Sequence, residues 1–370
     1  MKLSPPTMSS PLNTDHIRET LKTRLPFCAD LKSYESLPGD ASNRRYYRLV
    51  LTQAPMPSLI VMQLADPEGF KASEEAVSGG KQKITELPFL NVLRFLQSCS
   101  ITVPTVHYFD EAAGLLYLED FGDVTLSEAV IGADQAEREQ RYAQAIDTLV
   151  KMHVGAMSRD SSTCFAFGRA FDEPLLMWEF EHFLEYGVEV RRGKPMSVDD
   201  RFTVQKAFQR IAKLMTDQPP VFTHRDYHSR NLMVSGERLG VIDFQDALLG
   251  PATYDLASLL RDSYVALDEA MVDRLLSRYR EGMCAGLDRD TQKAMSFDAP
   301  VEFRRLFDFT SIQRNLKAAG RFVYIDRVKQ NPKFLADIPR TLRYVQDNLR
   351  KYPELHELFA HLSPYVPEWQ

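Results

Sequence analysis

The feature that most constrains the fold of this chain is a polar loop between short apolar segments. His224–Asn231 follows the strand-like Val221–Thr223 and precedes Leu232–Val234. A polar turn then leads into Leu239–Ile242, and Asp243 follows that segment directly. Short apolar runs around a turn that contains glycine are typical of a β-hairpin. The pattern therefore predicts a hairpin that brings three oxygen-bearing side chains together, those of Asp226, Asn231 and Asp243.

These three side chains are the parts that a phosphoryl-transfer site needs. A carboxylate at Asp226 can accept or orient the proton of an attacking hydroxyl. Asn231 and Asp243 offer the hard oxygen ligands that Mg²⁺ prefers. Asp and Asn alone are common in turns, where they bond their own backbone. Because spacing, apolar flanks and hairpin context agree here, the pattern predicts a magnesium-dependent kinase.

Composition describes an ordinary globular protein with material for two lobes. The chain has 370 residues, 44% of them hydrophobic and 26% charged, and a formal net charge of −6. This charge argues against a nucleic-acid partner. The four cysteines are far apart, which argues against a zinc site or a disulfide framework. No signal peptide and no apolar run of membrane-spanning length is found. We therefore expect a soluble, cytoplasmic protein without a membrane partner.

The first third of the chain is rich in strand-like segments. Residues 1–29 form an N-terminal segment in which Asn13 or Thr14 is suited to cap a short helix. Residues 30–120 are predicted to form an N-lobe, a five-stranded antiparallel sheet with one principal helix. We expect the helix, Glu86–Cys99, to pack on that sheet. The predicted strands are Lys32–Leu37, Arg45–Leu51, Ser58–Leu64, Thr105–Phe109 and Leu115–Leu118.

From residue 121 onward the pattern is mainly helical, and residues 121–370 are predicted to form a C-lobe that contains the catalytic loop. The predicted helices are Glu137–His153, Phe180–Val190, Val204–Met215, Thr253–Ala266 and Val301–Ala319. A β-rich lobe followed by a helical lobe gives a bilobal α+β fold. Trp178, Glu179, Glu181 and His182 carry groups suited to binding a sugar, although the apolar residues among them favour the core face of a helix.

The motif of His224, Asp226, Asn231 and Asp243 resembles the signature of the aminoglycoside phosphotransferase superfamily. The resemblance covers nearly the whole chain from about Leu31, and it implies a protein-kinase-like fold. Three further segments resemble a narrower group, the bacterial anomeric N-acetylmuramate/N-acetylglucosamine kinases of cell-wall recycling. These segments are Gly39–Arg48, Gly250–Asp262 and Gln313–Gly320.

The resemblance implies a role for each matching residue. It makes Asp226 the catalytic residue and Asn231 and Asp243 the Mg²⁺ ligands. It also implies that ATP binds near Ser42, Asn43, Glu119 and Phe121, and that the acceptor is the anomeric hydroxyl of a small sugar.

Other polar residues near the motif are candidates with more than one interpretation. Asp255 either caps a helix or supports the loop by bonding the backbone around His224. His224 is expected to support the site as a structural histidine and not to act as a general base. For the acceptor site the candidates are Tyr227, His228, Arg230, Asp246 and Arg314. Arg314 or Lys317 is suited to face an anionic lactyl group, and an exposed base on an amphipathic helix is the alternative.

The third predicted strand lacks the lysine that kinases usually pair with the nucleotide phosphates. Cations that can compensate are Arg44, Arg45, Arg48, Lys71, Lys81 and Lys83. Two other functions therefore stay open. One is an aminoglycoside or small-alcohol phosphotransferase of the choline or homoserine type, and the other is a nucleotide-binding pseudokinase.

Overall fold

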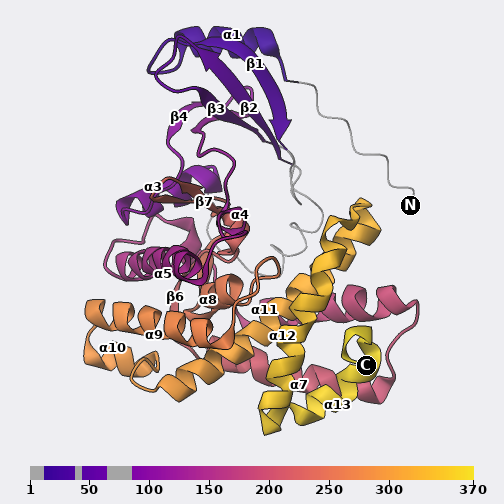
Figure 1. Ribbon diagram of the computed structural model, residues 1–370. Helices are drawn as coiled ribbons and strands as arrows, with labels where there is room; N and C mark the ends of the chain where they lie inside the picture. Colours follow the sequence, from indigo (N-terminus) through magenta and orange to yellow (C-terminus); the bar gives the residue numbers. More distant parts are fainter. Residues whose placement is uncertain (1–11, 38–43, 65–85) are drawn as a thin grey trace. The chain divides into compact units, whose positions relative to one another are not determined.

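The computed structural model describes residues 12–37, 44–64 and 86–370 (Figure 1). The chain divides into two compact units. The first comprises Met1–Ser73 and Pro104–Gly122, and the second comprises Glu74–Val103 and Asp123–Gln370. Within the described ranges, no helix is both long and apolar enough to cross a membrane.

The first unit is built on the five-stranded antiparallel sheet that the sequence predicts. Its strands lie in the order β1-β2-β3-β5-β4. Buried and partly exposed residues alternate along β2, as expected for a strand with one face on the core. Helix α1 packs Ile17 and Leu21 into the same core, and Asn13 is its N-cap. The elements are α1 (Thr14–Thr23), β1 (Asp30–Leu37), β2 (Arg45–Thr52), β3 (Ser58–Gln63), β4 (Val106–Asp110) and β5 (Leu115–Glu119).

Helix α3 (Pro88–Ser98) forms near its predicted position, but its packing differs from the expectation. It belongs to the second unit and not to the sheet. The ring of Phe89 lies 5.0 Å from that of Phe244, and the ring of Phe95 lies 5.6 Å from that of Phe222. Aromatic side chains bury large apolar areas, and these contacts decide where the helix packs. Leucine spacing alone predicted the helix and did not identify its partner.

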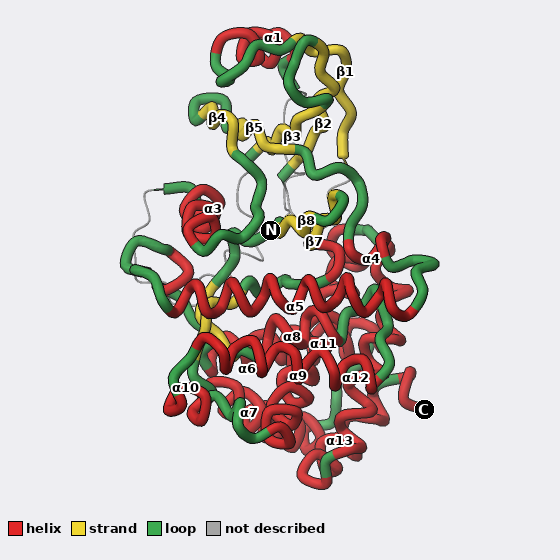
Figure 2. Tube along the Cα trace, turned by 60° about the vertical axis from the view of Figure 1, so that its left-hand side comes forward, coloured by secondary structure: helices red, strands yellow, loops and turns green. Residues whose placement is uncertain are grey.

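The second unit is mainly helical, as Figure 2 shows in red. Helix α5 packs on α9, and α11 packs on α8 and α12. The helices are α4 (Leu126–Ala129), α5 (Gln135–Met157), α6 (Glu173–His182), α7 (Val198–Thr216), α8 (Thr253–Leu260), α9 (Glu269–Gly286), α10 (Arg289–Ala294), α11 (Pro300–Lys329), α12 (Ile338–Lys351) and α13 (His356–Leu362).

Several bounds differ from the prediction. The predicted helix Phe180–Val190 is the end of α6 followed by a π-helix, η2 (Phe183–Val190). Helix α8 ends six residues before Ala266, and α11 continues ten residues beyond Ala319. Within α11, Gly320 permits a close approach to η2, because a Cβ atom there would lie 2.8 Å from the Cα atom of Phe183.

Two small sheets carry the polar loop. Strands β7 (Leu232–Ser235) and β8 (Arg238–Val241) form the predicted hairpin. Strand β6 (Pro220–Thr223) enters the loop and pairs with β9 (Leu248–Pro251), a pairing that the sequence analysis did not predict.

Candidate active site

The polar loop begins with a backbone turn that a buried carboxylate holds in place. Arg225 adopts φ +81°, in the left-handed region that side chains other than glycine rarely adopt. The fully buried Asp255 of α8 accepts hydrogen bonds from the backbone N–H of His224 (2.7 Å) and of Arg225 (2.9 Å). The N-cap of α8 is Ala252, so these bonds match the supporting interpretation of Asp255 and not the capping one.

The imidazole of His224 joins the loop to the segment that carries Asp243. Its Nδ1 atom lies 3.3 Å from the backbone nitrogen of Asp226, which donates to it. Its Nε2 atom lies 3.0 Å from the carbonyl oxygen of Ile242. The two contacts together fix the tautomer with the proton on Nε2. His224 is therefore a positioning residue between the loop and the end of β8.

Asp226 is ionised at neutral pH. Burial raises the pKa of its carboxyl, but the nearby positive charge, chiefly that of Lys317, outweighs burial and holds the pKa well below its usual range. Burial also opposes the charge of Lys317, yet the Glu179 carboxylate raises the pKa of this amine above its ordinary value. The loop therefore presents an anion at Asp226 next to a cation from α11.

Asn231 and Asp243 lie at adjacent points of the site. The backbone N–H of Ile242 donates to the carbonyl of Asn231 at 3.1 Å, and Asp243 is the next residue. The Asn231 Nδ2 atom donates to the carbonyl of Asp226 at 2.9 Å, so this bond leaves the amide oxygen as an acceptor. Asp243 is exposed, and its Oδ1 atom accepts from Gln245 at 2.7 Å.

This donor set fits Mg²⁺, which takes one or two protein oxygens and completes its shell with water and phosphate. The described residues contain no group of three or more His, Cys, Asp or Glu suited to hold a metal by themselves. The oxygen donors that the site offers to a metal are the amide oxygen of Asn231 and the carboxylate of Asp243. The donors suit a metal that arrives with a nucleotide, in contrast to one held in a closed protein cage.

A buried ionic cluster behind the loop gives Glu179 a role that the core-face interpretation of α6 missed. Glu179 is 1% exposed. Its carboxylate accepts from Arg225 at 3.0 Å and from Gln313 at 2.7 Å, and it lies 3.2 Å from the Lys317 amine. It thereby links the turn at Arg225 to α11. The sequence signalled it only as a polar group suited to binding a sugar, in a stretch of apolar residues that favour the core face of a helix.

The five acceptor candidates fall into different surroundings. Tyr227 is fully buried, and its hydroxyl donates to the carbonyl of Ala145 at 2.8 Å, so the structure gives it a packing role instead of contact with a substrate. Asp246 lies partly buried after Asp243. His228, Arg230 and Arg314 are the remaining three.

His228 and Arg230 surround the ring of Tyr264. The imidazole of His228 meets that ring edge-on at 5.3 Å, and the guanidinium of Arg230 lies over it at 3.6 Å. Burial, more than any charge nearby, lowers the pKa of His228. Arg314, from α11, is buried.

The nucleotide candidates lie in the first unit. Ser42 and Asn43 lie outside the described residues. The Glu119 carboxylate accepts from the backbone N–H and the hydroxyl of Thr105, at 3.1 and 2.9 Å. Phe121 is partly buried.

One of the compensating cations that the sequence offered, Arg48, is engaged by acids of the first unit. Strand β3 contains no lysine. Arg48 is engaged by the Asp120 carboxylate, with Nε and Oδ2 2.6 Å apart, and by Glu35 at 3.4 Å. Its charge is therefore already balanced within the first unit. The three candidate lysines, Lys71, Lys81 and Lys83, lie outside the described residues.

Comparison with known proteins defines the class to which this fold and site belong. A family model described as "phosphotransferase enzyme family" matches residues 33–291, and the chain belongs to that family. The similar solved structures include a choline/ethanolamine kinase family protein from Mesorhizobium loti, with a TM-score of 0.54 and 16% identity over 94% of this chain and 98% of that one. An ADP-bound aminoglycoside phosphotransferase has a TM-score of 0.53 and 15% identity over 90% of this chain and 97% of that one. At this level of sequence identity, the two solved structures establish that the chain shares their kinase-like fold.

Curated relatives are more similar in sequence. An N-acetylmuramate/N-acetylglucosamine kinase of Pseudomonas putida is 32% identical over 88% of this chain and 86% of its own. A protein of the same name from Neisseria meningitidis is 32% identical over 89% of each chain. The relatives that these comparisons name therefore agree with the group that the sequence motifs resemble.

Proposed function

We propose that this chain is an ATP-dependent sugar kinase that phosphorylates the anomeric hydroxyl of N-acetylmuramate and N-acetylglucosamine. The product is a sugar 1-phosphate, which suits reuse in cell-wall precursors in the cytoplasm. The observation that carries the proposal is the hydrogen-bonded junction of the Asp226–Asn231 loop with the Asp243 segment, through His224 and Ile242. The names of the relatives support the choice of acceptor.

Asp226 is the proposed catalytic residue. An ionised carboxylate with a low pKa is a weak base, so its main contribution is to accept a hydrogen bond from the acceptor hydroxyl and orient it. The proton passes to Asp226 late, because the hydroxyl becomes acidic only as its oxygen donates a lone pair to the γ-phosphorus and the bond from that phosphorus to the departing ADP oxygen breaks. His224 and Asp255 fix the backbone on which Asp226 stands.

Asn231 and Asp243 are the proposed Mg²⁺ ligands. When bound with ATP, Mg²⁺ would neutralise charge on the phosphates. The oxygen donors of both residues fit this role, and Gln245 orients the Asp243 carboxylate. The nucleotide roles of Ser42, Asn43, Glu119 and Phe121 stay predictions, as does the acceptor role of Asp246.

The test is an ADP-release assay with both sugars, kanamycin and choline as separate acceptors. We expect turnover with the sugars and a loss of about 10²–10⁴-fold in kcat for Asp226→Asn, because a positioned acid–base group contributes this much. Asp199→Asn, an exposed acid in the first turn of α7, is the matched control. Turnover only with kanamycin or choline would contradict the acceptor. Nucleotide binding without transfer to any acceptor would indicate the pseudokinase.

A further inference from the structure

We infer that Arg314 and Arg230 form an anion subsite beside the catalytic loop that recognises a carboxylate on the acceptor sugar. The inference rests on the proposed function and deepens it. It assigns to these two arginines the discrimination between an acidic and a neutral amino sugar as acceptor.

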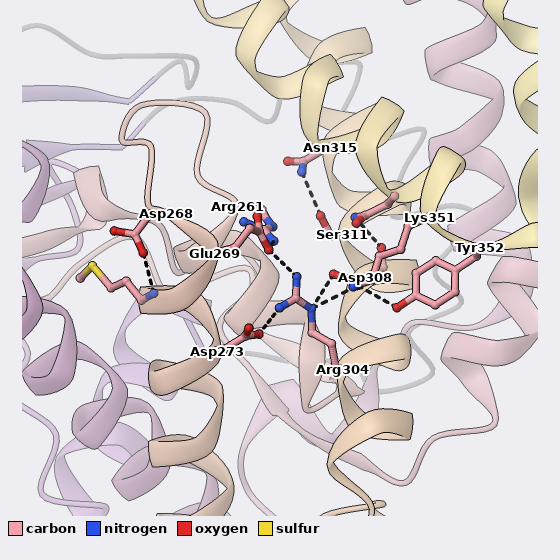
Figure 3. A network of polar contacts seen from close by, with 12 residues as sticks. Arg261, Asp268, Glu269, Asp273, Arg304, Asp308, Ser311, Asn315, Lys351 and Tyr352 are labelled. Atoms are coloured by element: carbon pink, nitrogen blue, oxygen red, sulfur yellow. Dashed lines mark hydrogen bonds and ion pairs between the residues drawn. The ribbon is translucent and has the colours of Figure 1, made fainter.

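Arg314 is a buried cation without a counter-ion. Its side chain is 6% exposed, and its Nη1 atom donates to the Oδ1 atom of Asn315 at 3.2 Å. Asn315 is held in turn, because its amide nitrogen donates to Ser311 at 3.2 Å (Figure 3). Within the described ranges no carboxylate forms an ion pair with Arg314. A buried charge is costly unless it is paired, and a bound anion would supply the missing partner.

Arg230 adds a second donor in the same neighbourhood. Its guanidinium lies flat over the Tyr264 ring, and its Nη1 atom is buried without a hydrogen-bond partner in the described part of the chain. The charges of both arginines act on Tyr264, and that of Arg314 also acts on His228. The Tyr264 ring, which meets His228 of the catalytic loop, therefore carries Arg230 on its face and lies within electrostatic reach of Arg314.

Within the described ranges, the acidic residues nearby form no ion pair with Arg314 or Arg230. Asp262 is fully buried, and its two oxygens accept from the backbone N–H of Ser229 and Tyr264, at 2.9 and 2.8 Å. Asp337 interacts with Arg230 electrostatically but forms no ion pair with it among the described residues. Lys317, the other cation considered for this role, lies between two acids, 3.2 Å from the Glu179 carboxylate and within electrostatic reach of Asp226. The positive charge available to a ligand is therefore that of Arg314 and Arg230.

A carboxylate on the acceptor matches this arrangement. Guanidinium groups bind carboxylates through paired N–H donors. N-acetylmuramate differs from N-acetylglucosamine by a lactyl ether that ends in a carboxylate. His228, on which Arg314 acts, lies two residues from Asp226 in the loop that would orient the acceptor hydroxyl. The transferred phosphoryl group is the other anion that could meet these arginines, and the two possibilities differ in their consequences.

The experiment compares three acceptors, N-acetylmuramate, its neutral carboxamide and N-acetylglucosamine, with the wild type and Arg314→Gln. A charge-assisted hydrogen bond predicts that the wild type has about 10- to 100-fold higher kcat/KM for the acid than for the amide. In Arg314→Gln this ratio should fall toward one. Loss of activity by the same factor for all three acceptors would indicate contact with the phosphoryl group and would overturn the inference.

Two measurements keep the test decisive. Arg314→Lys preserves the charge without the paired donors, and it should retain an intermediate ratio. If circular dichroism shows that Arg314→Gln does not fold, the inference is tested instead by the ratio of kcat/KM for the acid to that for the amide, measured in the wild type and in Arg230→Gln. Equal kcat/KM for acid and amide in the wild type would overturn the inference while leaving the kinase intact. Failure of the wild type to phosphorylate any of these sugars would refute the proposed function itself.

Discussion

Replacement of Asp255 by asparagine tests whether a buried carboxylate holds the catalytic loop. The two oxygens of Asp255 accept from the N–H groups of His224 and Arg225. Hydrogen bonds to a charged group contribute about 1.5–3 kcal/mol each. Asparagine keeps one acceptor oxygen at neutral strength and turns a second donor toward a buried N–H. We therefore expect the free energy of unfolding to fall by about 2–4 kcal/mol.

Catalysis should suffer in addition to stability. Arg225 adopts its left-handed backbone conformation directly before Asp226, and loss of the bond to its N–H allows the turn to relax. A displacement of about 1 Å can cost 10²-fold in rate. At a temperature where the variant is folded, kcat should drop by about 10- to 100-fold.

Urea denaturation and steady-state kinetics measure the two effects. The matched control is Asp199→Asn, since Asp199 also lies in the first turn of a helix but is exposed. It removes the same charge near a helix N-terminus and should cost less than about 1 kcal/mol. If Asp255→Asn were as stable and as active as this control, Asp255 would not support the loop, and the reasoning would be refuted.

Two further predictions concern the helical unit. The Asp308 carboxylate is fully buried and accepts from Arg304, from Lys351 at 2.6 Å and from Tyr352 at 2.8 Å (Figure 3). In urea denaturation, Asp308→Asn should therefore lower the free energy of unfolding by about 3–5 kcal/mol. A loss of less than about 1 kcal/mol would contradict this prediction.

Burial, together with the charges of Arg321 and Lys317, lowers the pKa of His182 to about 4. The unfolded state then binds more protons, so stability should fall by on the order of 3 kcal/mol as pH drops from 6.5 to 4. In urea denaturation at a series of pH values, His182→Phe should lose less of its free energy of unfolding between pH 6.5 and 4 than the wild type does. An equal loss in both proteins would contradict the role of His182.

The sequence predicted the parts of the fold that local patterns encode. Strands of alternating polarity predicted the sheet of the first unit, and the apolar flanks of the polar loop predicted the β7–β8 hairpin. The pairing of β6 with β9 and the packing of α3 on aromatic rings were missed, because they depend on partners distant in sequence. Local spacing carries no information about such partners.

The site shows the same division. Asp226, Asn231 and Asp243 are close in sequence, and their motif is recognisable from the residues alone. Glu179 and Arg314 are different, since each lies on a helix where a lone charge usually faces solvent. Their burial follows from the packing of α6 and α11, which no pattern within either helix predicts.

The measurement that tests the central claim most directly is ³¹P NMR of the product formed from ATP and N-acetylglucosamine labelled with ¹³C at C1. The account predicts a new sugar-phosphate resonance whose phosphorus is coupled to the labelled carbon, and its loss in Asp226→Asn. A phosphate resonance without that coupling would place the transfer at another hydroxyl, and the absence of any sugar phosphate would contradict the proposed reaction.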